Sequence, residues 1–212
     1  MNVIELFAGA GGMALGLKHA GFEHSLLVEF DKRCCETLKR NGFKHVKCAN
    51  VNAVDFSPYR GATLVAGGVP CQPFSNAGVG AGNLDPRNGW PAAVRAVREI
   101  KPRTFLFENV AGLLREKFKN YLDSILKQFW DLGYSVHVFK VDAADYGVPQ
   151  HRKRVFIVGL RGVHWFGVPK CAPGMNRSHR TPHFAAVHCN CVLNTSFHAH
   201  STNTAHTHKH TQ

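Results

Sequence analysis

Short apolar runs alternate with helical apolar faces along the first part of the chain. The apolar runs predict β-strands at residues 3–7, 25–29, 63–66, 103–108, 134–141 and 154–160. Helices are predicted at residues 13–20 and 32–40, and over a longer segment that stops at Gly133. In this longer segment, the apolar residues from Phe118 to Phe129 recur at the spacing of one amphipathic helix face.

This alternation of strand and helix predicts an α/β fold with a mostly parallel sheet covered by helices on both faces. In such sheets, ligands bind beyond the carboxyl ends of the strands. A glycine loop, Glu29, a Pro-Cys-Gln segment and the Glu108-Asn109 pair each follow a predicted strand. We therefore expect all four to converge on one crevice.

Length and composition indicate one domain of ordinary size. The chain has 212 residues, of which 44% are apolar, and a formal charge of +12 that favours an anionic partner such as nucleic acid. Glu5 and the glycines from Gly9 onward interrupt any signal peptide, and no apolar run is long enough to span a membrane. The seven cysteines show no paired framework. We expect a protein of the cytoplasm or of the nucleus or nucleoid, with reduced thiols, and not a secreted one.

The chain changes character near Gly162. Residues 163–212 contain four basic residues, no acidic residue and nine of the 14 histidines, and we expect a disordered His/Thr-rich tail after a folded domain at residues 1–162. The Cys and His pairs of this tail lack structural zinc spacing, so we predict adventitious nickel or zinc binding and no designed metal site. We interpret the tail as the product of a truncated gene that is translated onward in another reading frame. Sequencing the source transcript tests this, because a tail in the expected reading frame would contradict it.

The loop FAGAGG at residues 7–12 lets the backbone approach a ligand closely. Glu29 stands 20 positions after Gly9, where an acidic side chain can accept hydrogen bonds from ribose hydroxyls. The pair indicates a nucleoside-containing cofactor. Taken alone, the loop does not distinguish a nucleoside site of this kind from an ordinary glycine turn or from a nicotinamide enzyme.

Three further segments carry candidate reactive groups. Cys71, in GGVPCQPFS, follows a strand in a tight turn where a nucleophilic thiol would be accessible, although most cysteines are small buried hydrophobes. Glu108, in ENV, could be protonated in a crevice shielded from water and donate to a ring nitrogen, or it could be a helix cap or a surface acid. In QHRKR, Arg152 and Arg154 share one strand face and could hold a carboxylate, carbonyl or phosphate, or they could simply begin a basic strand.

Together these segments resemble the C5-cytosine DNA methyltransferases. The matching motifs, in the family's order, are FAGAGG, VPCQPFS, DPRNGW at residues 85–90, ENV and VPQHRKR. The resemblance covers roughly residues 2–161. It implies a Rossmann-like methyltransferase fold that binds S-adenosylmethionine and acts on double-stranded DNA, with a place in restriction-modification.

The resemblance also implies roles for residues around the cofactor. Phe7, Gly9 and Gly11 would line its methionine end, and Glu29 would bind the ribose. The residues expected at the adenine are Phe30 and Val51, with Pro70 and Trp90 nearby. Asn50 is a departure, because the family usually has an aspartate that contacts the adenine amino group. The Asn50 carbonyl can still accept that bond, so we expect weaker cofactor binding.

In the mechanism that the resemblance implies, the Cys71 thiolate adds to carbon 6 of a cytosine flipped out of the duplex. Glu108 hydrogen-bonds or protonates N3, so that carbon 5 becomes nucleophilic. Arg152 and Arg154 would position Glu108 and the base carbonyl, and Asn109 would brace the turn. The glycine-rich loop at residues 76–83 would close over the base, or it is simply a surface loop.

Family members normally continue into a target-recognition domain and a final segment that completes the cofactor pocket, and neither is recognisable here. Another polypeptide could supply the recognition domain. Two alternatives therefore stay open beside a DNA methyltransferase. The chain could be a non-catalytic remnant that only binds cofactor or DNA, or a transfer-RNA cytosine-5 methyltransferase.

Overall fold

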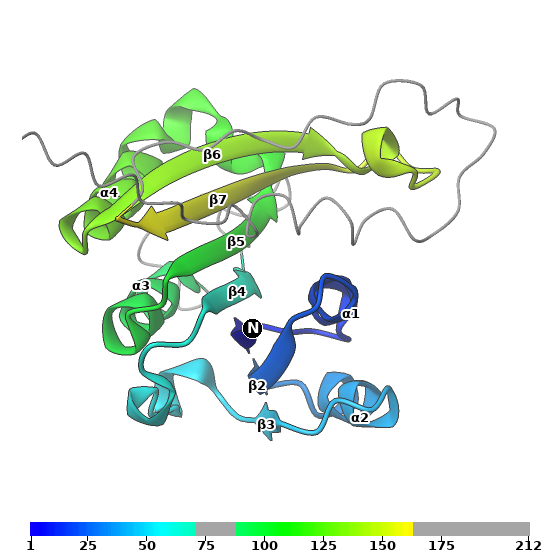
Figure 1. The fold of residues 1–212 in the computed structure, drawn as a ribbon. Helices are drawn as coiled ribbons and strands as arrows, with labels where there is room; N and C mark the ends of the chain where they lie inside the picture. The colour runs from blue at the N-terminus through cyan, green and yellow to red at the C-terminus, as the bar shows by residue number, and fades with distance from the viewer. Residues whose placement is uncertain (71–87, 163–212) are drawn as a thin grey trace, which may run out of the picture.

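The computed structural model describes residues 1–70 and 88–162, which form a sheet with helices on both faces (Figure 1). The strands are β1 (Asn2–Leu6), β2 (Glu23–Glu29), β3 (Val46–Cys48), β4 (Leu64–Gly68), β5 (Thr104–Val110), β6 (Tyr134–Asp142) and β7 (Lys153–Arg161). The α-helices are α1 (Gly12–His19), α2 (Lys32–Arg40), α3 (Trp90–Ile100) and α4 (Lys119–Asp131). The tail expected at residues 163–212 lies outside the described residues.

The seven strands follow the order β3-β2-β1-β4-β5-β7-β6. The first five strands in this order run parallel to one another, whereas β7 runs antiparallel to both β5 and β6. The chain moves outward from β1 to β3 and then returns to the other side of β1 to start β4. The predicted α/β fold with a mostly parallel sheet is therefore confirmed, and the ends of β1 and β4 flank its switch point, where such sheets bind ligands.

The two faces of β1 meet different helices. Ile4 and Leu6 are fully buried in the larger core cluster, which includes side chains of α3 and α4, whereas Val3 is buried in a second cluster with Leu17 of α1. Figure 1 shows the same division, with α1 and α2 on one side of the sheet and α3 and α4 on the other. Alternate side chains of one strand thus pack against the helices on both faces of the sheet. The ends of the strand are not covered by these helices and can contact a ligand.

Helix α4 confirms the predicted amphipathic segment. Its buried residues are Leu122, Ile125, Leu126 and Phe129, spaced as one helix face. The Phe129 ring lies 4.3 Å from that of Phe105 on β5, measured between centroids. The helix ends shortly before Gly133, which adopts φ 85°, a left-handed conformation that favours glycine. No helix within the described ranges is long and apolar enough to cross a membrane.

Two elements were not predicted by the apolar pattern. Strand β3 has only three residues, Val46–Cys48, and none of them is buried. Helix α3 begins at Trp90, inside a segment that the sequence identifies as a motif, with Pro91 in its first turn. Its polar residues Arg95, Arg98 and Glu99 lie opposite the buried alanines and valines, so the segment does carry the spacing of an amphipathic helix.

Candidate active site

The loop after β1 turns sharply beneath the ligand-binding edge of the sheet. Phe7 has φ 54°, an uncommon conformation for a residue with a side chain that costs on the order of 1–3 kcal/mol. Gly11 has φ 96°, and a Cβ there would lie 2.7 Å from Leu38 Cδ2. The backbone N–H of Gly11 donates to the Ala8 carbonyl at 3.0 Å, and α1 begins at the next residue. The glycine at position 11 is therefore required both by conformation and by close packing.

Glu29, at the end of β2, is hydrogen-bonded to the same loop. Its Oε2 accepts from the Gly9 N–H at 2.8 Å, and its Oε1 accepts from the N–H groups of Phe30 and Asp31, each at 2.9 Å. The residue is only 7% exposed. A carboxylate can accept about four hydrogen bonds, so one further donor, such as a sugar hydroxyl, can still bind.

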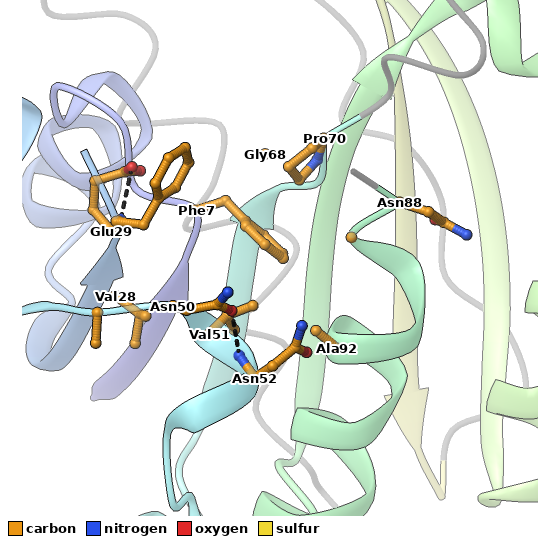
Figure 2. Close-up of a pocket in the computed structure, with 13 residues that line it drawn as sticks. Phe7, Val28, Glu29, Asn50, Val51, Asn52, Gly68, Pro70, Asn88 and Ala92 are labelled. Carbon is orange, nitrogen blue, oxygen red and sulfur yellow. Dashed lines mark hydrogen bonds between the residues drawn. The ribbon is translucent and has the colours of Figure 1, made fainter. Parts of the chain in front are cut away.

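A cavity of about 470 Å³ opens beside this loop. Figure 2 shows side chains from several strand ends around it. Six of the residues that the sequence assigns to a cofactor line it: Phe7, Glu29, Phe30, Asn50, Val51 and Pro70. Its volume lies in the range of small-molecule sites, and it borders the switch point of the sheet.

Phe30 presents an open aromatic face to this cavity. The residue is 73% exposed, although a phenylalanine normally buries its ring, and it directly follows Glu29 on the cavity wall. An exposed ring beside a carboxylate that can bind a sugar suits the stacking of a planar base. Val51 and Ala92 also line the cavity.

Asn50 begins the 3₁₀ turn Val51–Ala53. Its Oδ1 accepts a hydrogen bond from the Asn52 N–H at 2.9 Å, drawn as a dashed line in Figure 2. One acceptor site of the amide oxygen is therefore used within the turn. The amide oxygen is neutral, so any remaining bond that it accepts from a ligand is weaker than one to a carboxylate.

A second group of polar residues lies where β4, β5 and β7 meet. Arg154 Nε lies 2.6 Å from Glu108 Oε1, and both side chains are about one-fifth exposed, at 22% and 23%. The Glu108 carboxylate also faces Gly68 of the cavity wall, because a Cβ on Gly68 would lie 3.6 Å from Glu108 Oε2. This ion pair therefore borders the same cavity.

Asn109 connects β5 to the end of β4. It is 1% exposed, and its Nδ2 donates to the Val69 carbonyl at 3.3 Å, while its Oδ1 accepts from the Val110 N–H at 2.8 Å. The Val69 N–H in turn donates to the Glu108 carbonyl at 3.2 Å. These bonds fix the backbone immediately before Pro70 and Cys71.

Arg152 precedes β7 and is exposed. Its backbone N–H donates to Asp142 Oδ1 at 2.9 Å, and its carbonyl accepts from the Ala143 N–H at 3.1 Å. His151 lies 3.0 Å from the other oxygen of Asp142 and is the largest cause of a lowered Asp142 pKa. The structure thus brings Arg154, and not Arg152, into contact with Glu108.

Several predicted residues lie elsewhere. Cys71, the loop at residues 76–83 and residues 85–87 of the DPRNGW motif fall outside the described residues. Gly9 and Gly11 support the cavity without lining it, and Trp90 is 1% exposed, packed edge-on against Phe107 at 5.9 Å between ring centroids. Their cofactor roles stay predictions.

Other lining residues were not identified from the sequence, among them Asn88 and Ala92. Asn88 Oδ1 accepts from the Trp90 N–H at 3.1 Å, and its Nδ2 donates to Tyr121 Oη at 2.6 Å. Asn88 belongs to the DPRNGW motif, and this motif was the sequence feature from which its place at the cavity could have been predicted. Within the part of the chain that the structure describes, no cluster of three metal-ligating side chains occurs.

Comparison with known proteins identifies the family of this chain. The family model of the C-5 cytosine-specific DNA methylases matches residues 1–211. The Type II methyltransferase M.NgoMIV of Neisseria gonorrhoeae is 45% identical over 159 residues, which cover 74% of this chain and 51% of that protein. The Type II methyltransferase M.Eco47II of Escherichia coli is 45% identical over 164 residues, covering 76% of this chain and 39% of that protein.

Solved structures show the same fold. A DNA modification methyltransferase from an E. coli prophage has a TM-score of 0.63 at 29% identity, over 76% of this chain and 47% of that one. The S. pombe Dnmt2 methyltransferase has a TM-score of 0.62 at 21% identity, over 79% of this chain and 52% of that one. The chain spans about half or less of the length of these relatives. The extent of the family match shows that the chain belongs to the C-5 cytosine-specific DNA methylase family.

Proposed function

We propose that this chain carries the catalytic part of a DNA (cytosine-5-)-methyltransferase. The observation that carries the proposal is the Glu108–Arg154 ion pair, which borders a nucleoside-sized cavity whose wall includes Pro70, next to Cys71 in the sequence. Together with family membership, this arrangement supports a site that holds a methyl donor on one side and a cytosine on the other. Duplex DNA is the proposed substrate, and a separate chain that supplies the recognition domain is a proposed partner.

The residues that line the cavity fit S-adenosylmethionine, the methyl donor of this family. Glu29 retains acceptor capacity for a ribose hydroxyl, and Phe30 offers an exposed ring for the adenine. Asn50 and Val51 would border the base, while the loop at Phe7 would hold the methionine end. When bound, this cofactor supplies an electrophilic methyl group.

The protein's own residues would activate the cytosine. Cys71, as a thiolate, would form a bond to carbon 6, while Glu108 would hold a proton at N3. The electron pair displaced from the ring double bond then makes carbon 5 nucleophilic. After methylation, the proton on carbon 5 leaves and the bond to Cys71 breaks, which restores the aromatic ring. Arg154 would hold Glu108 in place throughout, because its Nε already contacts one carboxylate oxygen.

A methyl-transfer assay tests the proposal. Purified protein is incubated with S-adenosylmethionine labelled in its methyl group and with either mixed-sequence duplex DNA or transfer RNA. We expect label on DNA with the wild-type chain and none with Cys71→Ala. Equal incorporation by the two proteins would contradict the proposal. Label on RNA alone would favour a transfer-RNA methyltransferase, and cofactor binding without transfer would favour a non-catalytic remnant.

Asn50→Asp should tighten cofactor binding. One carboxylate oxygen would keep the bond from the Asn52 N–H, and the other would offer a charged acceptor to the adenine amino group. We expect a Kd for S-adenosylhomocysteine roughly fivefold lower, which corresponds to about 1 kcal/mol. Isothermal titration calorimetry measures this change. Asn41→Asp, on the exposed end of α2, introduces the same charge away from the cavity and should leave the Kd unchanged.

A further inference from the structure

Helix α3 contributes Ala92 to the cavity wall and carries Arg95 one helical turn further on. Ala92 lines the cavity directly, and Figure 2 shows it opposite Val51 and Asn52. Arg95 follows three residues later on the same side of the helix and is half-buried. It does not line the cavity, but its guanidinium group reaches the turn that does.

Arg95 donates to two backbone carbonyls of this turn. Its Nη2 donates to the Val51 carbonyl at 2.8 Å, and its Nη1 donates to the Val54 carbonyl at 3.2 Å. The planar guanidinium group can hold both carbonyls at once, which an ammonium group of lysine cannot do with the same geometry. The two bonds span the turn from its first residue to the residue after its end.

Two neighbours fix the orientation of this guanidinium group. Glu99, one turn further along α3, accepts from Nη1 at 3.0 Å. The ring of Phe56 lies beneath the guanidinium carbon, 5.0 Å from it to the ring centroid, and Phe56 is fully buried. Contacts with Glu99 and Phe56 therefore fix the guanidinium group independently of the turn, so that it can hold the turn in place.

The turn itself has little other support. None of its three residues, Val51–Ala53, is buried, although Val51 packs partly against the core. Its internal bonds run from the Asn52 N–H to Asn50 Oδ1 at 2.9 Å, from the Ala53 N–H to the Asn50 carbonyl at 2.9 Å and from the Val54 N–H to the Val51 carbonyl at 3.2 Å. These local bonds shape the turn but do not set its distance from α3. The Arg95 contacts hold both ends of the turn toward the helix, alongside the burial of Val54 in the core.

We propose that Arg95 is a positioning residue that fixes the adenine side of the cofactor site, by holding the Val51–Ala53 turn against α3. This inference rests on the proposed function, because it assigns the adenine to the Asn50–Val51 wall. Losing the guanidinium group would let that wall move, while the glycine loop at the methionine end and Glu29 at the ribose keep their own hydrogen bonds. Binding would then weaken through the adenine contacts alone, which both a full cofactor analogue and a bare nucleoside make.

The test compares Arg95→Met, Arg95→Lys and Arg98→Met. Arg98 lies on the exposed face of the same helix and is the matched control for loss of a positive charge. Calorimetry gives the Kd for S-adenosylhomocysteine and for methylthioadenosine, which shares the nucleoside but lacks the amino acid end. Hydrogen exchange follows the amides of Ala53 and Val54.

We expect Arg95→Met to weaken both ligands by the same factor, roughly tenfold. Arg95→Lys should recover part of this loss, and Arg98→Met should show none. Amides of Ala53 and Val54 should exchange faster only in the Arg95 variants. A loss much larger for S-adenosylhomocysteine than for methylthioadenosine would overturn the inference, because it would place the effect at the other end of the site.

The outcomes also separate the inference from the proposed function. Unchanged binding by Arg95→Met, with normal binding by the wild type, would refute the positioning role alone. Failure of the wild-type chain to bind either ligand would contradict the cofactor site itself, and the inference would fall with it.

Discussion

Glu108→Gln should slow methyl transfer to cytosine by roughly 10²–10⁴-fold, the usual contribution of a general acid. Glutamine keeps the length of the side chain and can still donate a hydrogen bond to N3, but it cannot deliver a proton there. It also loses the negative charge that faces Arg154 Nε at 2.6 Å. Single-turnover kinetics with a labelled methyl donor measures the loss directly, because it isolates the chemical step from product release.

Glu116→Gln is the matched control for this change. Glu116 lies in an exposed 3₁₀ turn before α4 and should leave the rate unchanged. Cofactor affinity should be the same in both variants, since Glu108 is not among the residues that line the cofactor cavity. A Glu108→Gln variant with wild-type single-turnover rate would remove Glu108 from the mechanism.

Gly67→Ala should destabilise the fold by about 3 kcal/mol or more. Gly67 lies in the middle of the sheet, where β4 pairs with both β1 and β5. A Cβ at this position would collide with the backbone carbonyl oxygen of Leu6, and that carbonyl belongs to a paired strand that cannot move aside. Chemical denaturation followed by circular dichroism gives the free energy of unfolding.

Gly16→Ala is the contrasting substitution. Gly16 lies inside α1, and a Cβ there would meet no atom within 4 Å. Alanine should therefore stabilise the protein, by about 0.5–1 kcal/mol, because it lowers the entropy lost when the helix forms. Equal effects of the two substitutions would contradict the close approach of β4 to β1.

Much of the fold could be predicted because parallel sheets follow simple rules. Buried strands are continuous apolar runs, and their carboxyl ends share one edge, so Phe7, Glu29, Pro70 and Glu108 could be brought to that edge from the sequence alone. Strand β3 could not be predicted, because a three-residue edge strand without a buried side chain has no apolar pattern.

The details of the site depend on contacts that sequence patterns do not encode. The resemblance implied that Glu108 is positioned by an arginine, but the sequence pattern does not show whether Arg152 or Arg154 makes this contact. The difference arises because Asp142 holds the backbone at Arg152 before β7 begins, while Arg154 lies opposite Val110 in the β5–β7 pair. Arg95 was missed for a similar reason. It acts on backbone carbonyls, which carry no sequence signature.

Trapping with 5-fluorocytosine tests the central claim most directly. Fluorine at carbon 5 cannot leave as a proton does, so the bond between the enzyme and carbon 6 should persist after methyl transfer. The chain is incubated with S-adenosylmethionine and duplex DNA that contains this base, and the covalent complex is digested and mapped by mass spectrometry. We predict a base adduct on Cys71 that requires the cofactor and is absent in Cys71→Ala. Binding of cofactor and DNA without an adduct, or an adduct on another residue, would contradict the account.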